Sequence, residues 1–141
     1  MLAEKTKQET SIGLLKFFFI MHFFVDVIVA IPLFLCPVFF LTKLGWQIVD
    51  PVAARLVAAA LFGIGIESYL GRKASKDTFI SMLNLKIIWS FAAVIGLGLS
   101  MLQNAQGSPL ALQVMFIIFL AFHLLWVYWR FHLGELLKKI T

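Results

Sequence analysis

Five ionisable side chains lie within stretches of the chain that are otherwise apolar. His22 and Asp26 lie in the first stretch, and the next three stretches contain one such residue each: Glu67, Lys86 and His123. A charged group in hydrocarbon costs several kcal/mol unless it is paired or hydrated, so each of the five needs a partner. Histidines and carboxylates can relay protons, and with an ammonium group they can hold a polar or amphipathic molecule. These five residues form the candidate site.

The spacing of these residues suggests how they pair. His22 and Asp26 are four residues apart, so they share one face of a helix. We expect Lys86 to be the counter-ion of Asp26. Ser90 lies four residues after Lys86 and can extend the network, whereas Asn84 falls on another side of that helix. We include Ser90 and Asn84 as supporting residues.

The apolar stretches that carry these residues are long enough to be transmembrane helices. Of the 141 residues, 62% are hydrophobic and 13% are charged. A membrane-spanning helix needs about 20 apolar residues, and four stretches qualify: 17–41, 52–70, 78–102 and 110–129. Short connections favour antiparallel neighbours. The sequence therefore predicts an all-α integral membrane four-helix bundle, a single domain over 1–141 with up-down-up-down topology.

Capping residues support these boundaries. Asp50-Pro51 and Ser108-Pro109 each place a good N-cap before a proline at the first helical position. Gly71 can end the second helix, and Ser75 or Asp77 can cap the third.

Other residues predict how the helices bend and pack. Pro32 and Pro37 should bend the outer half of the first helix, because each removes a backbone donor. Arg55 is expected to reach the outer interface or to pair with Asp50. In the second helix, small residues predict close packing. Ala59 and Gly63 share one stripe with Glu67 at a spacing of four residues, and Ala58 and Gly65 lie nearby.

The basic residues predict the orientation in the membrane. They gather before the first span, between the second and third, and after the fourth, as Lys5, Lys7, Lys16, Arg72, Lys73, Lys76, Arg130, Lys138 and Lys139. The positive-inside rule therefore predicts a multi-pass protein of the cell membrane with both termini in the cytoplasm. On this topology all five ionisable residues lie within about 14 Å of the cytoplasmic boundary, at roughly 1.5 Å of rise per residue.

This shared depth leaves several functions open. The main interpretation is a non-enzymatic protein that binds or transports a small molecule or ion through a polar cavity facing the cytoplasm. Alternatively, Asp26 and Lys86 form an ion pair that fixes helix register in a structural subunit of a larger membrane complex. A third interpretation is a membrane enzyme or a cofactor-bearing subunit.

The cofactor alternatives depend on the same side chains. His22, Asp26, Glu67 and His123 have the atoms to ligate a metal ion, and the two histidines could be axial ligands of a haem. Lys86 would oppose a cation beside them, and no ligand pair carries a known motif. The sequence therefore predicts no cofactor and no metal.

Composition also limits the partners. Cys36 is the only cysteine, which excludes an internal disulfide and dithiol redox chemistry. The net charge of +5 comes from residues beside apolar spans, where anionic headgroups account for it, so nucleic acid is not expected. The expected partners are the lipid bilayer, a small-molecule or ion ligand, and a second copy of the chain or a larger membrane complex.

Overall fold

The computed structural model describes residues 2–73, 75–103 and 108–138, with side chains for 9–73, 75, 78–103 and 108–135. These residues are all-helical apart from short connections. The helices are α1 (Leu2–Leu35), α2 (Pro37–Lys43), α3 (Pro51–Leu70), α4 (Lys76–Gln103) and α5 (Leu110–Lys138), with a 3-10 turn η1 (Gly71–Lys73).

Within the described residues, four helices are long and apolar enough to cross a membrane. They are Glu9–Leu35, Pro51–Lys73, Thr78–Gln103 and Leu110–Glu135. The predicted all-α class and four candidate spans are thereby confirmed. α1 begins earlier than its predicted span and α5 ends later, because the flanking lysine, glutamate and glutamine residues are good helix formers.

The first predicted span, 17–41, is divided into two helices. α1 ends at Leu35, Cys36 leaves helical geometry with φ −137° and ψ 59°, and α2 begins at Pro37. Proline suits the first position of a helix because its missing N–H would have no partner there. Pro32 remains inside α1. Of the two predicted bends, the one at Pro37 is therefore a break between helices.

The predicted N-cap of α3 and one of the two predicted for α4 are found. Asp50 Oδ1 accepts hydrogen bonds from the N–H groups of Val52, at 2.8 Å, and Ala53, at 3.2 Å. Ser75 Oγ similarly accepts from the N–H of Thr78 at 3.4 Å, at the start of α4. The Asp77 side chain lies outside the described residues. α5 begins at Leu110, where its predicted span begins, so Pro109 lies one position before the helix.

Arg55 bridges α3 to the end of α1. Its Nε donates to the backbone oxygen of Phe34 at 3.2 Å, next to the break at Cys36. The alternative pairing with Asp50 is not formed, since Asp50 caps its own helix. Arg55 thus supplies a donor to a carbonyl at the point where α1 gives way to α2.

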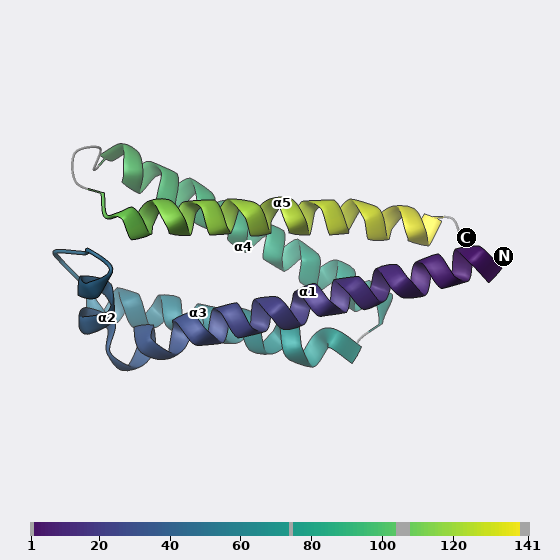
Figure 1. The fold of residues 1–141 in the computed structure, drawn as a ribbon, viewed down its shortest axis with the longest axis horizontal. Coiled ribbons are helices and arrows are strands. Elements are labelled where there is room, and N and C mark those ends of the chain that lie inside the picture. The colour runs from purple at the N-terminus through teal and green to yellow at the C-terminus, as the bar shows by residue number, and fades with distance from the viewer. Residues whose placement is uncertain (1, 74, 104–107, 139–141) are drawn as a thin grey trace.

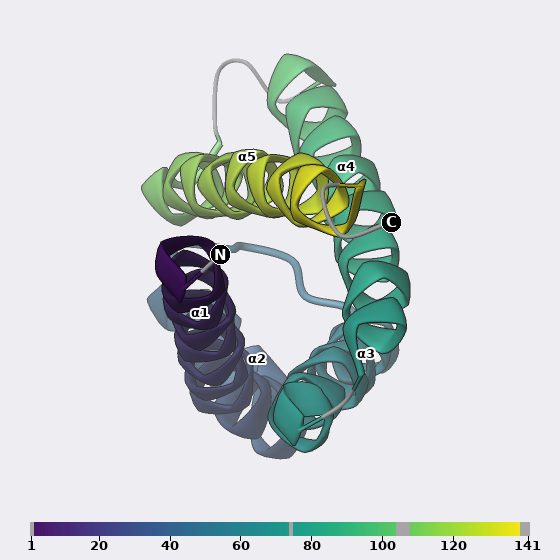
Figure 2. The same cartoon turned by 90° about the vertical axis from the view of Figure 1, so that its right-hand side faces the viewer.

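The long helices form two pairs. α1 packs along α3, and α4 packs along α5. In Figure 1 the N-terminal end of α1 and the C-terminal end of α5 lie at the same end of the molecule, opposite α2. Viewed along the long axis, α1, α2 and α3 occupy one side, and α4 runs obliquely from the α3 side toward α5 (Figure 2).

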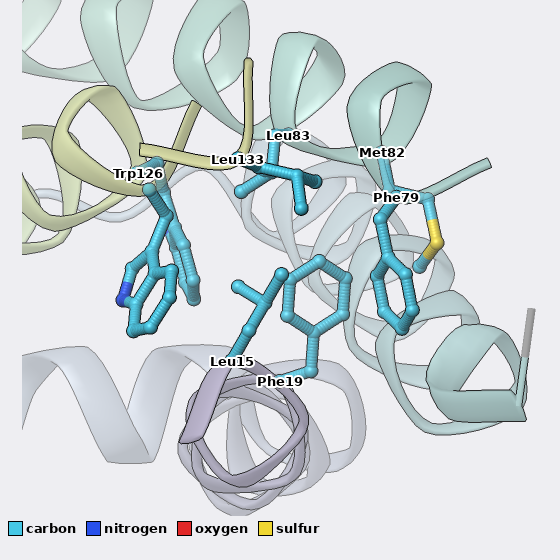
Figure 3. Packing of buried hydrophobic residues seen from close by; sticks show 8 residues of the cluster. Leu15, Phe19, Phe79, Met82, Leu83, Trp126 and Leu133 are labelled. Atoms are coloured by element: carbon cyan, nitrogen blue, oxygen red, sulfur yellow. The ribbon is translucent and has the colours of Figure 1, made fainter. Parts of the chain in front are cut away.

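An apolar cluster joins the two pairs near the end that carries the termini. It consists of buried side chains from α1, α4 and α5: Leu15, Phe19, Phe79, Met82, Leu83, Trp126, Trp129 and Leu133. Figure 3 shows Leu15 and Phe19 of α1 directed into the space between α4 and α5. The Phe19 ring meets Phe79 and Trp126 edge to face, with centroids 5.4 and 5.6 Å apart. This is a favourable aromatic geometry.

Small residues hold α3 close to α1, but on a different stripe from the predicted one. The buried residues shared by the two helices are Ala30, Leu33, Ala54, Ala58 and Leu61, and Gly65 is also buried. Ala59, Gly63 and Glu67 are exposed. The stripe predicted from Ala59 to Glu67 was therefore wrong, while the nearby Ala58 and Gly65 are the residues that pack.

Candidate functional site

Five buried polar side chains from three helices meet beside the apolar cluster. We call them the polar cluster: His22, Asp26, Ser68, Lys86 and Ser90, each at most 7% exposed. Four of them were singled out from the sequence. They come from α1, α3 and α4 and lie just beyond Phe19 on α1 and Leu83 on α4.

Lys86 is the centre of this cluster. Its Nζ donates to Ser68 Oγ at 2.6 Å and lies 3.2 Å from Nδ1 of His22. The same nitrogen lies 5.0 Å from the ring centroids of Phe19 and Trp126. Aromatic faces attract a desolvated cation. One ammonium thus contacts side chains from α1, α3 and α5.

His22 stands between the two charged residues. Its Nδ1 lies 2.9 Å from Oδ2 of Asp26, one turn along α1. That separation satisfies the distance of a hydrogen bond but not its direction, so Oδ2 accepts no hydrogen bond from the described part of the chain. The direct ion pair expected between Asp26 and Lys86 is not formed, since the imidazole of His22 occupies the position between them.

Ser68 was not predicted from the sequence. Its hydroxyl donates to the backbone oxygen of Ile64 at 2.6 Å, which leaves a lone pair to accept from Lys86. Ser68 lies three residues after Gly65, so both share one helix face. Recognising that this face packs against α1 would have identified Ser68.

Three predicted residues lie outside the polar cluster. His123 is half-buried and its Nδ1 lies 3.0 Å from Ser90 Oγ, so it touches the cluster through that serine. Glu67 is exposed, one residue before Ser68. Asn84 is also exposed, and its Oδ1 accepts from Nε of Arg130 at 2.8 Å, which ties α4 to α5.

A cavity of about 460 Å³ opens beside the polar cluster, on the side away from the apolar cluster. Its walls are largely aliphatic and aromatic, with Val29, Leu61, Leu97 and Phe119 among them. His22, Asp26, Lys86 and Ser90 form one end of its lining.

This cavity differs from the polar one expected from the sequence. It is apolar with one polar end, and it extends toward Leu41 and Leu44, away from the end that carries the termini. The difference arises because the ionisable side chains face one another, while the α1–α3 and α4–α5 pairs diverge beyond them.

The side chains named in the metal and haem alternatives lie in different surroundings. Among the described residues, no three His, Cys, Asp or Glu side chains converge closely enough to hold a metal ion. His22 packs its ring edge-on against Phe122 and Trp126, at 4.8 and 5.2 Å, whereas His123 lies against Phe91. The two imidazoles therefore have different surroundings.

Comparisons with protein-family models, curated proteins and solved structures find no match. The fold and site alone define the class of protein. The part of the chain that the structure describes is helical, with four candidate membrane spans and an apolar cavity that ends on buried polar side chains.

Proposed function

We propose that this is a multi-pass protein of the cell membrane, with up-down-up-down topology and both termini in the cytoplasm. The four candidate spans support the membrane assignment. The N-terminal end of α1 and the C-terminal end of α5 lie at the same end of the molecule. The basic residues concentrate at these two helix ends and in the turn between α3 and α4. Positive residues in short loops favour the cytoplasmic side.

Cysteine labelling tests this orientation. Ile48, 91% exposed between α2 and α3, and Lys73, exposed after α3, lie at opposite ends of α3. We would introduce Ile48→Cys or Lys73→Cys into a Cys36→Ser background and treat intact cells with a membrane-impermeant maleimide. We expect labelling only at position 48, with both positions labelled after lysis. Labelling of intact cells only at position 73 would show that the orientation in the membrane is the opposite of the one proposed.

The proposed function is binding of a small amphipathic molecule within the membrane. One observation carries it: an apolar cavity closed at one end by Lys86, His22 and Asp26. Small-molecule pockets are mostly apolar, with a few polar groups that fix orientation, and span roughly 300–1,000 Å³. A cavity of about 460 Å³ falls within this range.

Binding is favoured over transport because the cavity is closed toward the termini. Phe19, Phe79 and Trp126 pack there with at most 2% of each residue exposed. A transported molecule would have to separate these rings and pass the polar cluster. The proposal is therefore a binding site, and transport would be a further step that needs this apolar cluster to open.

Matched alanine substitutions test the cavity. Ala93 lines it, whereas Ala92 on the same helix is exposed and does not. Bromine quenches tryptophan fluorescence at short range, and Trp89 and Trp126 line the cavity. With protein in lipid nanodiscs, we expect bromohexanol to quench the wild type and Ala92→Phe saturably, and Ala93→Phe only through the linear background of the lipid. The same linear response in all three proteins, to bromohexanol and also to bromohexanoate and bromohexane used in its place, would refute binding in the cavity.

A further inference from the structure

The polar cluster is short of one hydrogen bond. Nδ1 of His22 lies beside both Nζ of Lys86, at 3.2 Å, and Oδ2 of Asp26, at 2.9 Å. Nδ1 is close enough to Oδ2 for a hydrogen bond but is not directed at it. Oδ2 is buried and accepts no hydrogen bond from the described residues.

The Lys86 ammonium group has a further hydrogen-bond donor near Asp26. An ammonium group carries three hydrogens. Within the described residues, its hydrogen-bonding neighbours are Ser68 and His22, and its other close contacts are the rings of Phe19 and Trp126. Asp26 and Lys86 both line the cavity. The polar end of the cavity thus offers an acceptor on Asp26 and a donor on Lys86.

We propose that the polar group of the ligand is a hydroxyl, so that the ligand is an apolar alcohol or phenol. This inference rests on the proposed function and specifies its ligand class. The carboxylate of Asp26 and Lys86 both line the cavity, so a hydroxyl there can donate to the carboxylate and accept from Lys86 at the same time. Asp26 and Lys86 have opposite formal charges, so a neutral group is suited to a position between them.

Other head groups can hydrogen-bond with only one of the two residues, Asp26 or Lys86. A carboxylate or phosphate accepts hydrogen bonds but cannot donate to Asp26 when ionised, and its charge repels that side chain. An amine in its ammonium form donates but faces Lys86. A head group without polar atoms leaves the acceptor of Asp26 unsatisfied, which is costly for a buried polar atom.

Three probes with the same hydrocarbon test the head group: bromohexanol, bromohexanoate and bromohexane. The readout is saturable quenching in nanodiscs, corrected by the response of Ala93→Phe. We expect bromohexanol to bind about tenfold or more tightly than either other probe, as one or two hydrogen bonds to charged groups imply. Equal or tighter binding of bromohexanoate would overturn the hydroxyl assignment. Equal binding of bromohexane would do the same, by showing that the head group is not recognised.

Asp26→Asn provides a second measurement on a nearly isosteric side chain. Removing the carboxylate charge should reduce the discrimination against bromohexanoate by about tenfold, because Lys86 then attracts that probe without opposition. Unchanged discrimination would refute the role of Asp26. Failure of this inference is distinct from failure of the proposed function: saturable binding of bromohexanoate or bromohexane alone preserves the cavity as a site. No saturable binding of any probe would refute both.

Discussion

Gly65 of α3 lies against Asp26 of α1 so closely that it leaves no room for a side chain. A Cβ at position 65 would lie 2.8 Å from Cβ of Asp26 and 3.3 Å from its Oδ2. Both residues are buried. The absence of a side chain at this one position allows α3 to approach α1 at the level of the polar cluster, and it brings Ser68, one turn further along, within reach of Lys86.

We predict that Gly65→Ala destabilises the protein. Cβ of Asp26 is fixed to the α1 backbone and cannot move aside, and overpacking costs roughly 1–3 kcal/mol. Thermal unfolding in detergent would show a lower Tm. Gly63→Ala is the matched control, because a Cβ there meets nothing within 4 Å. Equal Tm values for the two variants would contradict the close approach.

The position of Gly65 also shows what the sequence could not predict. α3 is apolar around most of its circumference, so in a membrane its pattern does not distinguish the packed face from the lipid face. The predicted stripe, which ends on Glu67, and the observed one, which ends on Ser68, differ by one residue. That is a rotation of about 100°. Glu67 is ionisable and therefore prominent in the sequence, whereas Ser68 has no ionisable residue four positions before it on its own helix that would mark it.

Other parts of the site were predictable. His22, Asp26 and Lys86 meet because burying ionisable groups is costly unless they share partners, a rule that needs only their depth along the helices. The cavity depends instead on the angle between the two helix pairs. No residue type encodes that angle, since the lining side chains are ordinary apolar residues such as Val29 and Leu97.

The charges of Asp26 and Lys86 are expected to be energetically coupled although His22 separates them. Asp26→Asn or Lys86→Met alone leaves one buried charge uncompensated, and we expect each to lower the free energy of unfolding by roughly 3–5 kcal/mol. The double variant removes both charges. It should lose less than the sum of the single losses, with a coupling of about 0.5–3 kcal/mol, as measured by reversible unfolding in detergent. Strict additivity would show that the two groups do not interact.

Ser68 is predicted to stabilise the Lys86 ammonium. Ser68→Ala removes the acceptor at 2.6 Å, and losing a hydrogen bond to a charged group costs about 1.5–3 kcal/mol. Ser81, exposed on α4, provides the control through Ser81→Ala. Thermal unfolding should separate the two variants clearly. A Ser68→Ala protein as stable as Ser81→Ala would mean that this contact contributes nothing.

Asp50 is predicted to stabilise the start of α3 through its cap. Asp50→Ala removes the acceptor for the N–H groups of Val52 and Ala53 and should cost about 1 kcal/mol. Asp50→Ser keeps a capping oxygen without the charge. It should therefore retain most of the stability in thermal unfolding. If serine were as damaging as alanine, the carboxylate charge and not the cap would be responsible.

A substitution at Gly96 tests how filling the cavity affects both the stability of the protein and the binding of a ligand. A Cβ at this position meets nothing within 4 Å, and Gly96 lines the cavity, whereas Gly63 is equally unobstructed but does not line it. Gly96→Leu and Gly63→Leu both replace a helical glycine by a better helix former, which favours each helix by up to about 1 kcal/mol. The leucine at position 96 also fills part of the cavity and should add about 0.5–2 kcal/mol.

We therefore expect the higher Tm for Gly96→Leu together with weaker saturable quenching by bromohexanol, while Gly63→Leu binds as the wild type does. If both variants gained stability equally and bound bromohexanol equally, the leucine at position 96 would not enter the cavity, and its walls would not be the surface that the ligand contacts.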